Sequence, residues 1–293
     1  MPHAVVDGIA TRYEVTGDGP PLLMFSPGGF HAVASNWSEH GVYRRLDLLP
    51  RLSERYSCIT FDRRESGGSG GRVQRLGWPD YVAQGLGLLD HLGAGSAYLM
   101  GGCVGCSVAV ACAVAAPSRV SGLVLYSPAG GARYRLRQHA RLGTHRSYAA
   151  AEGLAGVVSL ALSTGASFTD DPRGGPWCEV IRSDPAFAAV YAALDGSRYD
   201  TLIAGTVRAM FDRDTVPGAE PEDLLLLDTP ALIVPGDDES HAPSAAHYLH
   251  ECLRRSELWD VPVAQQTASN APDQILDFLD STTGRGVGAE PVR

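Results

Sequence analysis

The sequence has little basic charge, no long apolar run and no paired cysteines, and each absence excludes a class of protein. Lys and Arg number 24 against 33 Asp and Glu, which gives a formal net charge of −9. Such a chain offers no basic surface to a nucleic acid. No window approaches the roughly eighteen uninterrupted apolar residues of a membrane span, and no basic stretch followed by an apolar segment opens the chain. We therefore expect a soluble, cytoplasmic protein with neither a nucleic acid nor a membrane as partner.

The cysteines show neither C-x-x-C pairs nor metal-ligand spacing. Most of them lie inside apolar runs, as buried thiols do. The pattern indicates a reducing compartment and no metal site. The six cysteines are Cys58, Cys103, Cys106, Cys112, Cys178 and Cys252.

Length and periodicity predict one large α/β core. The 293 residues are 44% hydrophobic, which suits a single core of this size. Alternation of polar and apolar residues around Asp7-Gly8 predicts a half-exposed hairpin over Val5 to Val15. Alternating strands and helices imply a mostly parallel sheet of eight strands with helices on both faces. The further strands are expected at 21–26, 56–61, 97–100, 120–126, 231–235 and 257–263, and helices at 46–54, 80–92, 106–116 and 272–279.

One region breaks this alternation. Residues 129–227 are richer in Arg, Ala and helical periodicity, with a Gly- and Pro-rich stretch at 170–176. We predict a helical cap inserted into a core made of residues 1–128 and 228–281. The Gly-rich, polar residues 282–293 cannot bury enough apolar surface to order themselves and are expected to form a flexible tail.

The strongest local motif is Gly101-Gly102-Cys103-Val104-Gly105, between a predicted strand and a small-residue helix. A nucleophile on a strained strand-to-helix turn needs glycine neighbours, because larger side chains would collide with adjoining strands. The N-terminus of the following helix favours a thiolate over a thiol. Cys103 is therefore predicted to be a nucleophile. The alternative is a small buried residue beside a helix that needs glycines for packing.

This motif resembles the nucleophile elbow of the α/β-hydrolase superfamily, with cysteine in place of serine, and the resemblance extends over roughly residues 20–280. Residues 26–31 (SPGGFH) are similar to the Gly-rich loop of that family. The similarity implies that Gly29 or Phe30 donates one backbone N–H to the oxyanion hole and Val104 the other. The resemblance also implies the α/β-hydrolase fold and no cofactor.

Two further loops are similar to those of the family. Residues 62–69 (DRRESGGS) resemble its D-x-R-G-x-G-x-S loop, except that Glu65 replaces the first glycine, and a structural turn is expected there. Residues 235–243 (PGDDESHAP) resemble the loop that carries the acid of a catalytic triad. Either Asp238 or Glu239 fits that place.

The sequence departs from the family at the histidine loop. Residues 263–272 (VAQQTASNAP) contain no histidine, and Gln265 or Gln266 occupies the expected place. Glutamine cannot accept the proton of the nucleophile, so an ordinary triad is in doubt.

His241, two residues beyond Glu239 on the acid loop, is the candidate replacement because that loop lies beside the missing histidine in the family's fold. The alternative is a loop histidine bound to a carboxylate such as Asp238, with no catalytic duty. His31, near the oxyanion loop, is a second candidate.

Other positions are weaker candidates for a substrate pocket. Trp37, Trp177 and Phe211 are expected as apolar walls, although core positions fit them equally, and His31 is placed with them. The basic run 133–137 (RYRLR) could meet an anionic group of a substrate or form a solvated helix face.

The leading functional hypothesis is an enzyme, a probable hydrolase, that attacks an ester, thioester or lactone-like carbonyl of a small molecule through Cys103. A non-hydrolytic enzyme of the same fold (lyase, cyclase or isomerase) and a small-molecule-binding pseudoenzyme are the alternatives. The strained elbow favours an enzyme, since a pure binding protein has little need for it. A homodimer is left open.

Overall fold

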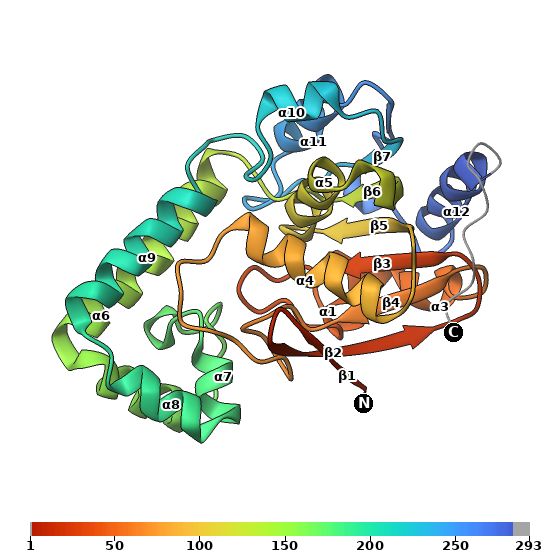
Figure 1. The fold of residues 1–293 in the computed structure, drawn as a ribbon. Coiled ribbons are helices and arrows are strands. Elements are labelled where there is room, and N and C mark those ends of the chain that lie inside the picture. Colours follow the sequence, from red (N-terminus) through yellow and green to blue (C-terminus); the bar gives the residue numbers. More distant parts are fainter. Residues whose placement is uncertain (1, 284–293) are drawn as a thin grey trace.

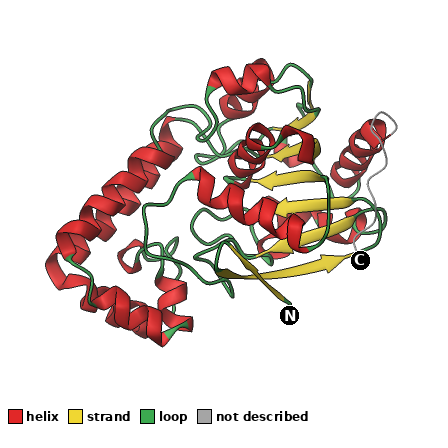
Figure 2. Cartoon of the chain, viewed as in Figure 1, coloured by secondary structure: helices red, strands yellow, loops and turns green. Residues whose placement is uncertain are grey.

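Eight strands form one sheet in the order β1-β2-β4-β3-β5-β6-β7-β8 in the computed structural model, which describes residues 2–283. β2 pairs antiparallel with β1 and β4, and the other pairs are parallel. Figures 1 and 2 show this sheet with helices on both faces. The strands are β1 (His3–Val6), β2 (Ile9–Thr16), β3 (Pro21–Phe25), β4 (Ser57–Phe61), β5 (Ala97–Gly102), β6 (Val120–Tyr126), β7 (Ala231–Val234) and β8 (Ser256–Leu258).

The first hairpin turns where the sequence predicts it, because Asp7 and Gly8 both adopt positive φ angles, 50° and 69°. The last strand is shorter than predicted. β8 ends at Leu258, and the predicted end at Val263 lies in a short 3-10 turn that follows Pro262. After Trp259 donates to the carbonyl of Ile233, the Val261 N–H donates back to the carbonyl of Trp259 at 2.9 Å, so the chain turns away from β7.

Two helical layers cover the sheet, and strand residues alternate between them. Leu99 of β5 packs on the side of α4, α5 and α11, whereas Tyr98 and Met100 pack on the side of α2, α3 and α12. The helix predicted at 46–54 is interrupted at Asp47, whose φ of 49° is left-handed. The core helices are α1 (Asn36–Glu39), α2 (Gly41–Leu46), α3 (Leu48–Leu52), α4 (Trp78–His91), α5 (Gly105–Ala115), α11 (Pro243–Cys252) and α12 (Asn270–Thr283).

Residues 129–227, the region predicted as a cap, contain helices and no strand, and we use the name cap for these residues below. The first helices of this region project beyond the carboxyl ends of β3 and β5 (Figure 1). α6 bends at Gly153, whose φ is 70°. The last helix of the region packs instead against α11, beside the core. The helices are α6 (Ala132–Thr164), α7 (Cys178–Ser183), α8 (Pro185–Ala192), α9 (Gly196–Met210) and α10 (Pro221–Leu226).

Helix α12 continues to Thr283, two residues into the predicted tail, and residues 284–293 lie outside the described residues. Within residues 2–283, no helix is both long and apolar enough to cross a bilayer. All six cysteines are free thiols. The described part of the chain contains no cluster of His, Cys, Asp and Glu that could hold a metal ion.

Candidate active site at the carboxyl edge of the sheet

The nucleophile elbow joins β5 to α5. Cys103 has a φ of 57°, which is strained for a residue with a side chain. Its backbone N–H donates to the carbonyl of Tyr126 at 3.2 Å, at the end of the neighbouring β6. A Cβ at Gly105 would lie 2.2 Å from the carbonyl oxygen of Phe25, so the glycine is needed for close contact with β3. These backbone contacts fix the sulfur at the end of the central strands.

His241 lies between Cys103 and Asp238. Its Nδ1 is 2.9 and 2.8 Å from the two carboxylate oxygens of Asp238. Its Nε2 is buried and has no hydrogen-bond partner among the described residues, and the imidazole interacts electrostatically with the Cys103 thiol. The imidazole is 17% exposed and the carboxylate 62% exposed. The structure therefore brings together three of the predicted catalytic residues.

The backbone of the acid loop holds this histidine in place. Gly130, just before α6, pairs with His241 in an isolated parallel bridge, and its N–H donates to the carbonyl of Ser240 at 3.0 Å. Asp238 accepts the backbone N–H groups of Ser240 at 2.7 Å and His241 at 3.0 Å. One carboxylate thus shapes the loop and orients the imidazole that the loop carries.

The electrostatics favour a thiolate and an imidazolium. Burial alone would raise the pKa of the Cys103 thiol, but its interactions with His241 and with the backbone N–H groups of Gly28 and Val104 together hold this pKa below its usual value. Burial would lower the pKa of His241, but the thiolate and Asp238 raise it to about 10. In contrast, burial raises the pKa of the neighbouring Cys106 thiol well above its usual value. Cys103 is the activated thiol of the pair.

Gln266, at the place where the family carries its histidine, has a structural role. Gln266 is fully buried; its side-chain oxygen accepts from the Tyr126 hydroxyl, and its amide donates to the carbonyl of Val261 at 2.9 Å. Gln265 is exposed in the short 3-10 turn. Neither glutamine lines the cavity at Cys103.

Two backbone N–H groups, those of Gly28 and Val104, face the Cys103 sulfur. Gly28 precedes the predicted donors by one residue and has a φ of 122°; a Cβ there would lie 2.2 Å from the carbonyl oxygen of His31. Gly29 lines the cavity. Phe30 does not, because its buried ring packs inward against other aromatic rings.

The loop 62–69 supports the oxyanion loop from behind. The Ser66 hydroxyl donates to the carbonyl of Phe30 at 3.0 Å and accepts the N–H of Ala32 at 3.2 Å. Asp62 accepts the N–H of Ala34 at 2.8 Å. The expected structural turn therefore determines where the N–H groups of residues 28–30 lie.

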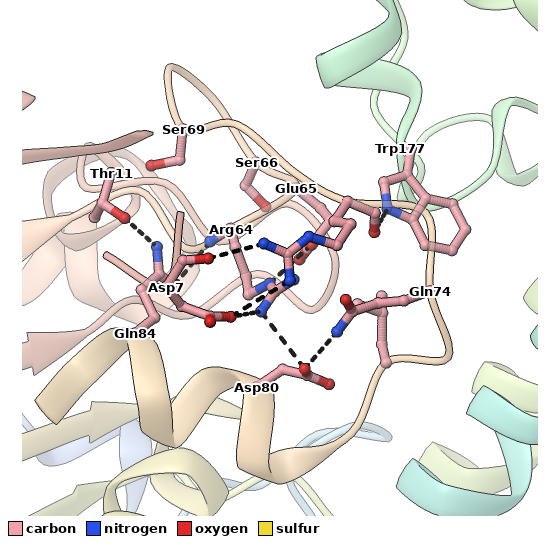
Figure 3. Close-up of polar contacts among 12 residues, drawn as sticks. Asp7, Thr11, Arg64, Glu65, Ser66, Ser69, Gln74, Asp80, Gln84 and Trp177 are labelled. Carbon is pink, nitrogen blue, oxygen red and sulfur yellow. Dashed lines mark hydrogen bonds and ion pairs between the residues drawn. The ribbon is translucent and has the colours of Figure 1, made fainter. Parts of the chain in front are cut away.

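Glu65, which replaces the family's glycine, adopts a φ of 69° and is paired with Arg64 in the interior (Figure 3). Both side chains are 1% exposed, and Arg64 Nε donates to Glu65 Oε1 at 2.9 Å. Asp7 and Asp80 lie 3.5 Å from the same guanidinium. This ion-pair network anchors the supporting loop to the first hairpin and to α4.

Cys103 opens into a cavity of about 640 Å³. Trp37, Trp177 and Phe211, expected as its walls, do not line it. Trp37 packs behind the elbow against Tyr43, Trp177 packs inside the cap, and Phe211 packs against Phe30. Large aromatic rings occupy the dry interior here, and the cavity is lined mainly by polar groups.

Two other candidates line the cavity but bind residues of the cap. His31 Nδ1 lies 2.6 Å from Glu179 Oε1 on α7, and this hydrogen bond raises the pKa of His31. Glu239 is 57% exposed and forms ion pairs with Arg133 and Arg137. Glu239 is thus turned away from His241, whereas Asp238 contacts it.

Sequence reasoning missed the cavity face of α6. Tyr134, Gln138 and Arg141 line the cavity, at spacings of four and three residues. Residues three and four positions apart lie on one face of a helix, so this spacing was the feature of the sequence that could have indicated a shared cavity wall. The three residues overlap the basic run 133–137 only at Tyr134, and another member of that run, Arg137, also lines the cavity.

Comparison with known proteins identifies the fold. Residues 21–150 match the family model described as alpha/beta hydrolase fold. A stretch of 127 residues is 31% identical to the dihydrolipoyllysine-residue acetyltransferase component of the acetoin cleaving system of Cupriavidus necator. The match covers 43% of this chain and 32% of that relative, so the chain spans about a third of its length.

Solved structures extend the likeness to nearly the whole chain. The meta-cleavage product hydrolase CumD of Pseudomonas fluorescens, a mutant complexed with acetates, has a TM-score of 0.61 at 16% identity and covers 96% of this chain and 98% of its own. The enol-lactonase of Burkholderia xenovorans has a TM-score of 0.61 at 19% identity, covering 95% of this chain and all of its own (100%). The chain has the α/β-hydrolase fold, which confirms the predicted fold class.

Proposed function

We propose that this chain is a hydrolase that attacks an ester, thioester or lactone-like carbonyl of a small molecule with Cys103 as nucleophile. The observation that carries the proposal is the placement of His241, whose Nδ1 binds Asp238 at 2.8 Å while its Nε2 faces the thiol. The same side of the sulfur opens into the cavity. Nucleophile, base and orienting acid are the parts that covalent catalysis requires.

In acylation, the Cys103 thiolate attacks the carbonyl carbon and a C–S bond forms. The carbonyl oxygen takes the electron pair and is stabilised by the backbone N–H groups of Val104 and Gly28, with Gly29 beside them. When the C–O or C–S bond to the leaving group breaks, the leaving group takes the proton from His241 Nε2. The product is a thioester on Cys103.

In deacylation, neutral His241 accepts a proton from water as the water oxygen attacks the thioester carbonyl. The tetrahedral intermediate collapses, the acid product leaves, and Cys103 departs as a thiolate beside a protonated imidazole. Asp238 keeps Nδ1 protonated throughout, so that Nε2 is the nitrogen that exchanges protons. The cycle needs no cofactor.

The names of two structural neighbours support a hydrolase, and one of the two names supports a lactone as substrate. One is an enol-lactonase and another a meta-cleavage product hydrolase. A lyase, cyclase or isomerase on this fold would use the same donors without a covalent intermediate, and a binding protein would use the cavity alone. These alternatives differ from the proposal in whether Cys103 becomes acylated.

Intact-mass spectrometry after incubation with activated para-nitrophenyl esters and thioesters tests this difference. We expect an acyl adduct on the wild type and none on Cys103→Ala, with turnover reduced by about 10³-fold or more in the variant. Cys252→Ala removes another free thiol, one that does not line the cavity, and should behave as wild type. Full turnover by Cys103→Ala would favour a non-covalent reaction, and ligand binding without turnover by the wild type would favour a binding protein.

A further inference from the structure

One face of α6 lines the cavity at Cys103 with polar side chains that make no hydrogen bond or ion pair among residues 2–283. Tyr134, Gln138 and Arg141 follow one another along this face and line the cavity that contains Cys103 and His241. None of the three takes part in the reaction described above. We refer to them as the α6 face.

Arg141 differs from the other arginines at the start of the helix. Arg133 and Arg137 form ion pairs with Glu239, and Arg135 forms one with Asp214 at 2.8 Å. Arg141 is half-buried and makes no ion pair or hydrogen bond within the described residues. Burial, and then the charge of Arg137, lower the pKa of Arg141, whereas Tyr134, the Cys103 thiolate and the more distant Asp170 oppose that shift. A half-buried cation without a counter-charge is costly unless a ligand supplies one.

Tyr134 is a second, independent sign of a ligand. Its side chain is 4% exposed, yet its hydroxyl has no hydrogen-bond partner among the described residues. Buried hydroxyls are normally paired, so an unpaired one at a cavity wall calls for an explanation. Gln138, only 3% exposed, lies one turn further along the same wall and offers an amide.

The acidic groups of the cavity are already engaged. Asp170 accepts from the Ser167 hydroxyl at 2.7 Å, Asp238 binds His241, and Glu239 binds two arginines. Glu39 is exposed to water at the rim. Asp170 attracts Arg141 electrostatically but forms no ion pair with it, so Arg141 is the cavity-lining arginine whose N–H donors have no acceptor among the described residues.

We propose that the α6 face binds a carboxylate of the substrate, so that the preferred substrates are carbonyl compounds that carry an anionic group remote from the scissile bond. Arg141 would supply the charge and two N–H donors, and the Tyr134 hydroxyl and Gln138 amide would supply neutral donors. A single unmatched guanidinium fits a monoanionic carboxylate better than a dianionic phosphate. The inference rests on the proposed function for the position of the reacting carbonyl at Cys103.

Kinetics with paired substrates test the inference. The anionic series is the mono-para-nitrophenyl esters of straight-chain dicarboxylic acids with six, seven and eight carbons. The neutral series replaces the free carboxylate by an isopropyl group of the same shape. We expect the wild type to prefer the anionic ester in kcat/KM by about 10- to 100-fold at the best chain length, the range of a charge-assisted hydrogen bond.

Arg141→Met should abolish this preference, mainly by raising KM for the anionic ester, and should leave the neutral series within about threefold. Arg141→Lys should restore part of the preference because it restores the charge. Arg135→Met is the matched control, since it removes an arginine of the same helix that does not line the cavity. No anionic preference at any chain length, or an equal loss for both series in Arg141→Met, would overturn the inference.

Binding separates this inference from the catalytic proposal. Calorimetric titration of Cys103→Ala with adipate measures the carboxylate site without any reaction, and Arg141→Met in that background should weaken binding about 10-fold or more. Arg141-dependent binding together with an absence of any acyl adduct on the wild type would keep the site and reject the chemistry. If the wild type forms the adduct but Arg141 affects neither adipate binding nor the charge preference, the catalytic proposal is kept and the carboxylate site is rejected.

Discussion

The core and the cap hold their functional side chains by different means. At the edge of the core, backbone contacts fix the site: Cys103 donates to Tyr126 on the next strand, and the bridge at Gly130 holds His241. In the cap, side chains determine the packing, and the α6 face leaves polar groups unpaired. The core is therefore suited to keep reacting groups at fixed positions, and the cap to change its preference for a ligand by single substitutions.

The inside of the cap shows the same reliance on side chains. The Tyr191 hydroxyl donates to that of Tyr199, which lies 2.5 Å from His145 Nε2. The other ring nitrogen, Nδ1, lies 2.9 Å from the carbonyl of Arg173. Because a carbonyl can only accept, Nδ1 carries the proton and Nε2 accepts, so the buried imidazole is neutral. The packing of the cap therefore depends on this chain of hydrogen bonds between side chains, whereas the close backbone packing around Cys103 depends on glycines.

The largest expected effect contrasts the two adjacent carboxylates of the acid loop. Asp238→Asn should reduce kcat/KM by about 10³- to 10⁴-fold, because an amide cannot keep Nδ1 of His241 protonated and stabilise the imidazolium. Glu239→Gln should change it less than about threefold, since Glu239 faces the cap arginines. Steady-state kinetics on a para-nitrophenyl ester measures both. Similar losses in the two variants would mean that the loop rearranges and that the acid assignment is wrong.

A smaller effect is expected on the free energy of unfolding when one glycine from the core and one from the cap are replaced by alanine. Gly105→Ala should lower the free energy of unfolding by about 3 kcal/mol, because its Cβ would meet the Phe25 carbonyl oxygen at 2.2 Å, and backbone cannot move aside cheaply. Gly143→Ala in α6 should raise it by about 0.5–1 kcal/mol, since a Cβ there meets nothing within 4 Å and alanine favours the helix. Urea denaturation of both variants measures the difference. A stable Gly105→Ala protein would show that the elbow is less constrained than these contacts imply.

Sequence alone predicted the parts of the site that depend on local backbone rules. The glycines around Cys103 and the loop bearing Asp238 and His241 are short contiguous motifs, and their chemistry constrains their spacing. The choice between Asp238 and Glu239 could not be made, because it depends on which carboxylate the cap arginines attract. The last strand was predicted too long because Val261 and Val263 are apolar, whereas the chain turns away from β7 at Trp259.

The pocket walls could not be predicted for a related reason. An aromatic side chain at a packed interior position and one at a cavity wall look alike in a sequence, and Trp37, Trp177 and Phe211 all proved to be interior. The residues that do line the cavity from α6 are polar and lie among charged neighbours. Only the path of the helix over the sheet distinguishes Arg141 from Arg135.

The smallest expected effect is the pH dependence of stability that comes from His145, the neutral histidine inside the cap. Burial, opposed by the hydrogen bond to the Arg173 carbonyl, lowers the pKa of His145 to about 4, below its ordinary value of 6.5. The unfolded chain therefore binds a proton more readily between these values, so the contribution to stability is complete above about pH 6.5 and is lost as the pH falls toward 4. By about pH 5 the loss should reach about 2 kcal/mol.

His145→Gln should make the free energy of unfolding, measured by urea denaturation, less dependent on pH. Replacing the exposed His247 by Gln should leave the pH dependence unchanged. Hydrogen exchange should show the loss first in α6 and α9 and last in β5, because the core strands do not depend on this imidazole; equal pH dependence in His145→Gln and wild type would contradict the neutral assignment.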